Sequence, residues 1–307
     1  MKYVIIGDIM IDKTIYGTVD RISPEAPIPV IQTLYNKEVV GGAGNVARNI
    51  RAVDPLADEV AAIGITSHRT CSLAAGITFK YGKHLNDDMQ NIKLRYIDVK
   101  TGYQLLRVDN EQAINVLTQR ILPTTIEQAL ETIKPNAVIL SDYCKGIITP
   151  TIAKLVITWC RANRALSFVD TRRRDISIFQ GASYITPNQK EYFMMAGNTN
   201  PLDFVHNMNL DGLLLTKGHE GIELHMNDEE QISIPPTNRD RIIDVTGAGD
   251  TVVASFAVAL CNGFKPEEAV LISNKLAGQV CMKSGTAIPD ETIENFKIKE
   301  TNLTSER

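Results

Sequence analysis

The sequence Asp-Val-Thr-Gly-Ala-Gly-Asp-Thr occupies residues 244–251, and a mostly apolar run follows it at 252–260. This combination predicts a tight turn that opens a buried helix. The first N–H groups of a helix have no carbonyl partner within it, so those of Gly247, Ala248 and Gly249 would be free to bind an anion. The stretch therefore predicts an anion site at the start of a helix.

Asp250 ends this turn and is the candidate catalytic residue. A carboxylate placed beside free amides can take a proton from an alcohol, while the amides stabilise the charge of a transferring phosphoryl group. The alternative is a glycine-rich helix start in which Asp250 is a first-turn acid favoured by the helix dipole. The octapeptide alone leaves both interpretations open.

The composition is that of an ordinary globular protein, with 44% hydrophobic and 22% charged residues among 307. A net charge of −4 gives no basic surplus, so we expect neither a nucleic acid nor a membrane as partner. The five cysteines form no C-x-x-C pair, which argues against a zinc site and a disulfide framework. No signal peptide or membrane-spanning segment is apparent, and we expect a cytoplasmic protein.

Short apolar runs alternate with helical patterns along most of the chain. This alternation predicts an α/β fold with a mainly parallel central sheet covered by helices on both faces. Ligands of such sheets bind at the carboxyl ends of the strands. We expect strands at 3–6, 60–63, 137–140, 166–169, 184–185 and 212–216, and helices at 44–53, 125–133, 150–160, 189–196, 251–262 and 266–282.

Two segments, 14–40 and 91–109, alternate like strands but have no helix between their strands. We expect a small antiparallel β lid formed by about 13–40 and 91–109; edge strands of the main sheet are the alternative. The chain would then be one domain over residues 1–300, followed by a frayed tail at 301–307.

Four sequence blocks occur in an order that is similar to the ribokinase-like (PfkB) carbohydrate kinases. They are Gly-Asp-Ile-Met-Ile-Asp at 7–12, Gly-Gly-Ala-Gly-Asn-Val-Ala at 41–47, Thr-Pro-Asn-Gln-Lys-Glu at 186–191, and the Gly-Ala-Gly-Asp turn. The resemblance covers nearly the whole chain. It implies the ribokinase-like three-layer fold, ATP and Mg²⁺ as cofactors, and Asp250 as the base that activates a sugar hydroxyl.

Four further stretches resemble the bacterial heptose 7-phosphate kinases of ADP-heptose and lipopolysaccharide precursor synthesis. They are Arg-Ile-Ser-Pro-Glu-Ala-Pro-Ile-Pro-Val at 21–30, Lys-Leu-Arg at 93–95, Gln-Leu-Leu-Arg-Val-Asp at 104–109 and Ser-Asp-Tyr-Cys-Lys-Gly at 141–146. The resemblance implies phosphorylation of the anomeric hydroxyl of D-glycero-β-D-manno-heptose 7-phosphate. Many such enzymes continue into a nucleotidyltransferase domain. This sequence ends where the kinase domain of those enzymes would end, so we expect only the phosphorylation step here. A kinase of another sugar or sugar phosphate, or a non-catalytic sugar- or nucleotide-binding protein, remains the alternative.

The expected substrate site combines hydrogen-bonding groups with basic residues of the lid. A carboxylate accepts bonds from two hydroxyls, an amide donates and accepts, and glycine lets the backbone approach a ligand. Basic lid residues would hold the substrate's phosphate, although exposed surface charge fits them equally. A turn residue is the alternative for Asp142. The substrate set is Asp12, Gly41, Gly42, Asn45, Lys93, Arg95, Gln104, Arg107, Asp142 and Lys145.

The expected nucleotide site centres on Asn188 and Glu191, three residues apart at a helix start. Such a pair can hold Mg²⁺ through water or orient the triphosphate, and its spacing fits a helix capping box equally well. Asp244 and Thr246 resemble the loop that binds a monovalent cation such as K⁺ in some relatives. The nucleotide set is Asn188, Glu191, Thr216, Gly218, Gly221 and Asn274, the last as an adenine contact; ordinary turn or surface roles remain open for the final four.

Two segments depart from the family pattern. The resemblance implies Asp-Pro-Lys-Gly after the strand at 166–169, but residues 170–175 read Asp-Thr-Arg-Arg-Arg-Asp. The segment 64–83 is compressed, so the helix expected there is reduced to 65–75. The contacts of the three arginines stay open at this point. The resemblance also implies a homodimer formed through the lid.

Overall fold

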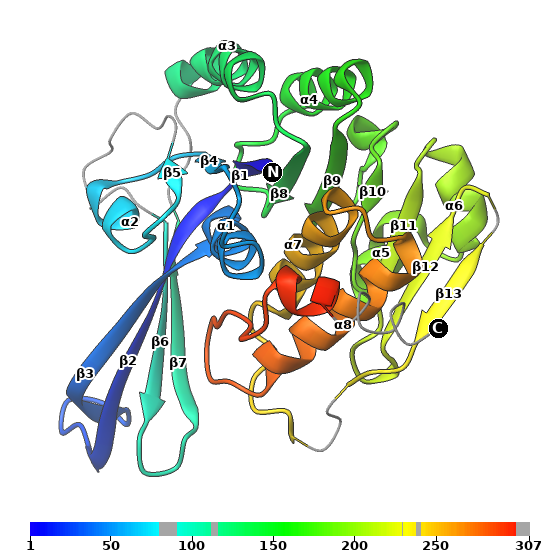
Figure 1. Ribbon diagram of the computed structural model, residues 1–307. Helices are drawn as coiled ribbons and strands as arrows, with labels where there is room; N and C mark the ends of the chain where they lie inside the picture. Colours follow the sequence, from blue (N-terminus) through cyan, green and yellow to red (C-terminus); the bar gives the residue numbers. More distant parts are fainter. Residues whose placement is uncertain (80–90, 112–115, 229, 238–240, 299–307) are drawn as a thin grey trace.

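The computed structural model describes residues 1–79, 91–111, 116–228, 230–237 and 241–298, and it contains two sheets (Figure 1). The larger sheet has the strand order β13-β12-β11-β10-β9-β8-β1-β4-β5. Its strands are β1 (Lys2–Gly7), β4 (Glu59–Ile63), β5 (Thr78–Phe79), β8 (Ala137–Asp142), β9 (Leu166–Thr171), β10 (Tyr184–Ile185), β11 (Gly212–Thr216), β12 (Ile222–Met226) and β13 (Gln231–Ile234).

The strands from β5 to β11 pair in parallel, and β12 and β13 extend the sheet in antiparallel pairing. In β1 the apolar side chains alternate between faces, as successive strand residues must. Tyr3 and Ile5 belong to one core cluster, and Val4 and Ile6 belong to the cluster on the opposite face. The expected α/β class with a mainly parallel sheet is confirmed.

Helices cover both faces of this sheet (Figure 1). One face packs against α1 (Ala43–Val53), α7 (Ala248–Cys261) and α8 (Pro266–Cys281), and the other packs against α3 (Val116–Ile133), α4 (Pro150–Asn163), α5 (Gln189–Ala196) and α6 (Pro201–Asn207). Among the shorter helical elements are α2 (His68–Ser72), η2 (Ser177–Phe179) and η3 (Gly218–Glu220).

Helix α7 lies deepest, with every residue from 250 to 259 buried. A helix that is apolar on all sides belongs in a protein interior. Thr251 donates a 2.8 Å hydrogen bond from its hydroxyl to the Asn49 side chain of α1. The beginning of α7, and Asp250 with it, is therefore held in a fixed place.

The smaller sheet projects from the main body (Figure 1). It contains β2 (Ile9–Ile22), β3 (Pro29–Gly42), β6 (Ile92–Asp98) and β7 (Gln104–Asn110), in the order β3-β2-β6-β7. The β2–β3 and β6–β7 pairs are antiparallel, and a parallel β2–β6 pairing joins them. Within the described residues these strands pair only with one another, which excludes the interpretation as edge strands of the main sheet.

Several elements differ from the sequence expectation. Helix α3 begins at Val116 rather than 125 and continues through Pro123. The edge strands β12 and β13 and the helix α6 were not expected. The compressed segment contains the five-residue α2, while residues 80–83 and the expected tail 301–307 lie outside the described residues. Across the described ranges, no helix is both long and apolar enough to cross a bilayer.

Candidate active site

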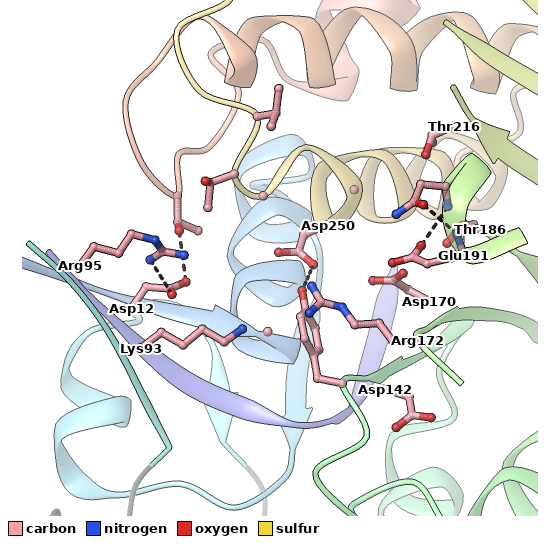
Figure 2. A pocket seen from close by; sticks show the side chains of 18 of the residues that line it. Asp12, Lys93, Arg95, Asp142, Asp170, Arg172, Thr186, Glu191, Thr216 and Asp250 are labelled. Carbon is pink, nitrogen blue, oxygen red and sulfur yellow. Dashed lines mark hydrogen bonds and ion pairs between the residues drawn. The ribbon is translucent and has the colours of Figure 1, made fainter. Parts of the chain in front are cut away.

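A cavity of about 330 Å³ lies where the carboxyl ends of the main-sheet strands meet the start of α7 and the base of the small sheet (Figure 2). Most of the expected site residues line it: Asp12, Gly42, Lys93, Arg95, Arg107, Asp142, Asn188, Glu191, Thr216, Thr246, Gly247, Gly249 and Asp250. The other expected residues do not line it: Gly41, Asn45, Gln104, Lys145, Gly218, Gly221, Asp244, Ala248 and Asn274. Six lining residues had no expected role: Tyr143, Asp170, Arg172, Thr186, Val245 and Thr286.

Asp250 is held by two side-chain donors. The Asn45 amide donates to its Oδ2 at 2.7 Å, and the Tyr143 hydroxyl donates to its Oδ1 at 3.0 Å. Asn45 is fully buried, and its own oxygen accepts a 3.3 Å bond from Arg48. Asn45 was expected to bind a sugar hydroxyl, but its amide is turned to the carboxylate instead. Each carboxylate oxygen keeps a lone pair for a substrate proton.

The turn before α7 depends on a glycine in the left-handed region. Gly247 has a φ of 82°, and a Cβ there would lie 3.0 Å from the Asn45 amide nitrogen. Any side chain would therefore strain the backbone and press on the group that holds Asp250. The need for glycine at position 247 therefore contributes to the placement of the Asp250 carboxylate.

The anion site at this turn differs in one respect from the expectation. The Ala248 N–H donates to the Val245 carbonyl at 3.2 Å, so it is not free as the sequence suggested. The N–H groups of Gly249 and Asp250 lie in the first turn of α7, where no helical carbonyl is available. Gly249 faces the cavity, since a Cβ built on it meets no heavy atom within 4 Å.

Burial raises the pKa of Asp250 to about 6, with a further contribution from the charge of Asp12. The hydrogen bonds from Asn45 and Tyr143 oppose this rise because they stabilise the ionised form. Burial and the nearby Asp250 carboxylate raise the pKa of Tyr143 well above 10. Tyr143 therefore stays protonated and donates to Asp250, which is ionised at neutral pH and able to accept a proton.

The loop after β8 places Tyr143 through a buried carboxylate. Asp8, in the link between β1 and β2, accepts the backbone N–H of Tyr143 at 2.8 Å and that of Lys145 at 3.0 Å. Asp8 was quoted in the first family block without a role. Asp8 lies between β1 of the main sheet and β2 of the small sheet, so the loop after β8 that it binds lies near the junction of the two sheets.

Asp12 lies in β2 on the small-sheet side of the cavity, where Arg95 pairs with it at 3.0 Å. The Thr286 hydroxyl, from the loop after α8, donates to Asp12 at 3.2 Å. A Cβ at Gly41 would lie 2.4 Å from the Asp12 carboxylate, so glycine at 41 makes room for this side chain. The two bonds leave Asp12 fixed and able to accept further hydroxyl donors.

The basic residues of the small sheet differ in their partners. Arg95 pairs with Asp12, and Arg107 pairs with Asp109 at 2.8 Å. Lys93 lies 4.7 Å from the centre of the Tyr143 ring, and no carboxylate in the described ranges is within ion-pair distance of it. Burial lowers the pKa of Lys93, partly opposed by the charge of Asp12. Of these three basic residues, Lys93 is thus the one most available to a ligand phosphate.

Three expected substrate residues have other surroundings. Lys145 pairs with Glu111 at 2.5 Å, and Gln104 is exposed on β7. The buried Asp142 carboxylate lies at the cavity wall, where Thr171 donates to it at 3.0 Å and Arg173 pairs with it at 2.5 Å. This geometry fits the alternative of a structural turn residue for Asp142.

The opposite side of the cavity carries acidic groups (Figure 2). Asn188 and Glu191 form a complete capping box at the start of α5, with reciprocal 2.9 Å hydrogen bonds. Both also line the cavity, so the capping interpretation and the functional one hold together. Burial, with the charges of Asp250 and Glu191, raises the pKa of Asp170 to about 8. Thr216 ends β11 beside them.

The outer nucleotide residues are farther from the cavity. Asn274 is buried and donates to the Pro235 carbonyl at 2.7 Å. Gly221 has a φ of 103°, and Gly218 and Gly221 flank the short η3 turn.

The Asp244 carboxylate accepts the N–H groups of Thr246 and Gly285, each at 2.9 Å. Although burial opposes it, these bonds hold the pKa of Asp244 below its usual range.

A divalent metal fits the acidic side of the cavity. Burial and the neighbouring carboxylates raise the pKa of Asp170. A nearby dication would relieve the repulsion between these carboxylates. Glu191 retains one oxygen that the capping box does not use. In the described part of the chain no three His, Cys, Asp or Glu side chains cluster as a complete metal site. Mg²⁺ here would complete its shell with water and phosphate oxygens.

Residues without an expected role reach the cavity through tertiary structure. Tyr143 lies in the stretch 141–146 that resembles heptose 7-phosphate kinases, directly after a predicted strand. Its position at the carboxyl end of that strand could have predicted that it lines the site. Thr286 follows a glycine in a loop after the last long helix, and no local pattern relates it to Asp12. Arg172 was noted only as a departure from the family pattern.

The chain resembles known proteins in sequence and in fold. The model of the family described as pfkB family carbohydrate kinase matches residues 1–293. The Bifunctional protein HldE of Caulobacter sp. (strain K31) is 34% identical over 303 residues, covering 92% of this chain and 60% of that protein. The protein of the same name from Aliarcobacter butzleri (strain RM4018) is 32% identical over 296 residues, covering 92% and 61%. The chain spans about 60% of the length of these relatives.

Solved structures share the fold. Escherichia coli phosphofructokinase-2 in complex with potassium has a TM-score of 0.75 at 19% identity, covering 99% of both chains. Arabidopsis thaliana ribokinase complexed with ribose and ATP has a TM-score of 0.71 at 17% identity, covering 97% of both chains. At these identities the likeness concerns the fold alone. The family match and the relatives above 30% identity show that the chain belongs to the pfkB family of carbohydrate kinases.

Proposed function

We propose that this carbohydrate kinase transfers the γ-phosphoryl group of ATP to the anomeric hydroxyl of a heptose 7-phosphate, with Asp250 as the base. The observation that carries the proposal is the buried Asp250 carboxylate. It is fixed by Asn45 and Tyr143 beside free amides, at a cavity with basic groups on one side and acidic groups on the other. Two ligands can meet there, a sugar phosphate near Lys93 and a nucleotide near Glu191.

In the proposed reaction Asp250 takes the proton of the sugar hydroxyl while the hydroxyl oxygen attacks the γ-phosphorus in line. The N–H groups of Gly249 and Asp250 stabilise the charge on the transferring group. The sugar is held by Asp12, itself fixed by Arg95 and Thr286. We propose that the small sheet acts as a lid that excludes water, which prevents hydrolysis of ATP.

Bound Mg²⁺ supplies neutralisation of phosphate charge in such transfers. Glu191 and Asp170 are the residues that we propose to hold it, directly or through water. The loop containing Asp244 and Thr246 is the proposed site for a monovalent cation. The potassium complex of the related phosphofructokinase-2 supports testing K⁺.

A phosphorylated heptose is supported by two observations. The stretches at 21–30 and 141–146 resemble heptose 7-phosphate kinases, and the relatives named HldE align over 92% of this chain. The cavity also presents Lys93, a cation without a carboxylate partner among described residues, which suits a substrate that carries its own phosphate. Another sugar phosphate is the second candidate, because the same cation would bind it.

The substrate assignment is tested by measuring ADP release over a panel of sugar phosphates and free sugars, with and without Mg²⁺. We expect turnover with the heptose 7-phosphate only when Mg²⁺ is present. Turnover restricted to another sugar would replace the substrate but keep the kinase. Tight binding of sugar and ATP without any turnover would favour a non-catalytic binding protein.

Lys93→Ala is expected to raise KM for the sugar phosphate about 10- to 100-fold, because a charge-assisted phosphate contact is worth about 1.5–3 kcal/mol. KM for ATP should change little, since Lys93 lies on the same side of the cavity as Asp12 and Arg95, where we propose that the sugar binds (Figure 2). Steady-state kinetics with each substrate varied in turn measures both constants. Lys37→Ala, an exposed lysine on β3, is the matched control. A larger effect on KM for ATP than on KM for the sugar phosphate would contradict the assignment.

The pH profile should have an acid limb set by Asp250. The base must be ionised to accept a proton, and burial raises its pKa to about 6. We therefore expect kcat/KM to be constant at neutral pH and to fall about tenfold per pH unit below about 6. An acid limb near pH 4, where an ordinary aspartate titrates, would show that another group limits the rate.

We also propose that the chain forms a homodimer through the lid and acts in the cytoplasm. The small sheet exposes a set of large apolar side chains, which supports an interface there: Ile22, Leu34, Tyr35, Leu105, Leu106 and Val108. The five cysteines are free, which fits a reducing compartment.

A further inference from the structure

Three consecutive arginines follow β9 and have three different environments. Arg172 lines the cavity, and its guanidinium carbon lies 4.3 Å from the centre of the Tyr143 ring. Arg173 points away and pairs with Asp142 at 2.5 Å. Arg174 is exposed and does not line the cavity. Only the first of the three can contact a ligand in the cavity.

The charge of Arg172 has no carboxylate partner within the part of the chain that the structure describes. Among the described residues, no carboxylate lies within ion-pair distance of its guanidinium, although Asp170, Glu191 and Asp250 line the same cavity. An unpaired cation among acidic residues is available for an anion of the substrate.

The Tyr143 side chain relates this cation to the base. Its ring holds the Arg172 guanidinium by a cation–π contact, and its hydroxyl donates to Asp250 at 3.0 Å. Figure 2 shows Arg172 in the same part of the cavity as Asp170 and Asp250. Lys93 contacts the same ring at 4.7 Å but comes from the small sheet. One aromatic side chain thus keeps the base and two cations in a fixed relation.

We propose that Arg172 contacts the transferring phosphoryl group and stabilises its charge in the transition state; this inference rests on the proposed function. In that step the sugar oxygen forms a bond to the γ-phosphorus, and the bond from this phosphorus to the β–γ bridging oxygen breaks. The electron pair leaves with ADP, and the sugar proton moves to Asp250. Arg172 donates hydrogen bonds to the phosphoryl oxygens and is not consumed.

A guanidinium suits this role because its planar fork binds two oxygens of one phosphoryl group. Arg172 stands two residues after Asp170, the spacing at which the expected Asp-Pro-Lys-Gly motif has its lysine. This chain therefore has a cation at the position of the motif's lysine, and the guanidinium of Arg172 can donate two parallel hydrogen bonds where a lysine acts as a point charge. The departure from the family pattern becomes a feature of this chain's own catalysis.

The test compares Arg172→Ala and Arg172→Lys with the matched control Arg174→Ala. We expect Arg172→Ala to lower kcat about 10²- to 10³-fold, somewhat less than the effect of an arginine supplied to a GTPase. KM for either substrate should change much less, because the contact strengthens only as charge develops. Added guanidinium ion should restore part of the rate to Arg172→Ala. Arg172→Lys should be intermediate and Arg174→Ala should equal wild type.

Loss of folding is separated from loss of catalysis by thermal unfolding of each variant. Arg172 is exposed, so the melting temperatures of Arg172→Ala and Arg172→Lys should match that of wild type. A kcat within about threefold of wild type, or a defect confined to KM for ATP, would overturn the proposal. If wild type phosphorylates no sugar of the panel, its slow hydrolysis of ATP provides the same comparison. A strong effect of Arg172→Ala on hydrolysis would then keep this inference while the proposed function fails. Absence of both activities in wild type would overturn both.

Discussion

Asp250→Asn is expected to lower kcat about 10³- to 10⁴-fold, because the asparagine cannot accept the proton of the sugar hydroxyl. Affinity for ATP should be largely retained, since Asp250 lies apart from Glu191 and Thr216, where we propose that the nucleotide binds (Figure 2). The variant should be at least as stable as wild type. The raised pKa of Asp250 means that its ionised form is disfavoured by folding, and asparagine carries no charge. Steady-state kinetics, ATP titration and thermal unfolding measure the three quantities.

Asp203→Asn is the matched control for this substitution. Asp203 is also the third residue of a helix, in α6, but it is exposed and lies outside the cavity. If Asp250 were only a first-turn acid favoured by the helix dipole, the two variants would behave alike, each losing a few tenths to about 1 kcal/mol of stability. Near wild-type turnover by Asp250→Asn would remove it from the role of base.

Gly249→Val is expected to lower kcat at least about 10²-fold, because its side chain would keep the phosphoryl group from the N–H donors at the start of α7, and losing one such donor costs about that much. A Cβ on Gly249 meets no heavy atom within 4 Å, so a valine side chain would extend into the cavity where the phosphoryl group is proposed to lie. Gly249 is within α7 and does not have a positive φ, so the substitution does not strain the backbone. Replacing a helical glycine should raise the melting temperature slightly.

Ala248→Val, one position earlier, separates filling of the cavity from a general effect on α7. Ala248 does not line the cavity, and its N–H already donates to Val245. We expect this control to keep most of its activity, and Gly249→Ala to fall between wild type and Gly249→Val. Equal losses for Ala248→Val and Gly249→Val would show that the start of α7, and not the space in front of Gly249, is what matters.

The central strands and helices were predictable because their patterns are strong and local. Strands such as β1 and β8 are apolar on both faces, and α7 follows a glycine turn with an unbroken buried run. The edge strands β12 and β13 were missed because polar residues such as Glu223 and His225 interrupt them. The helix expected at 125–133 covers only the second half of α3, which begins at Val116 and continues through Pro123. That helix continues at the cost of one backbone hydrogen bond.

The site was predictable where neighbours in sequence are neighbours in the structure. The turn before Asp250 and the capping box at α5 are of this kind. Long-range contacts were not predictable. Thr286 contacts Asp12 across 274 positions, and Asn45 contacts Asp250 across 205. Lys145 lies next to a cavity residue in sequence, yet its side chain pairs with Glu111. Sequence adjacency places a backbone but leaves the direction of a long side chain undetermined.

Observation of the reaction by ³¹P NMR shows directly whether the sugar receives a phosphoryl group and whether this transfer depends on Asp250. Wild type and Asp250→Asn are incubated with D-glycero-β-D-manno-heptose 7-phosphate, ATP and Mg²⁺, and the products are observed by ³¹P NMR. Wild type is expected to form a second sugar-bound phosphate at the anomeric carbon, in step with ADP, and Asp250→Asn is expected to form almost none. A heptose 7-phosphate that gains no second phosphate with wild type, or the same product formed at the same rate by both proteins, would contradict the role of Asp250 as the base of this kinase.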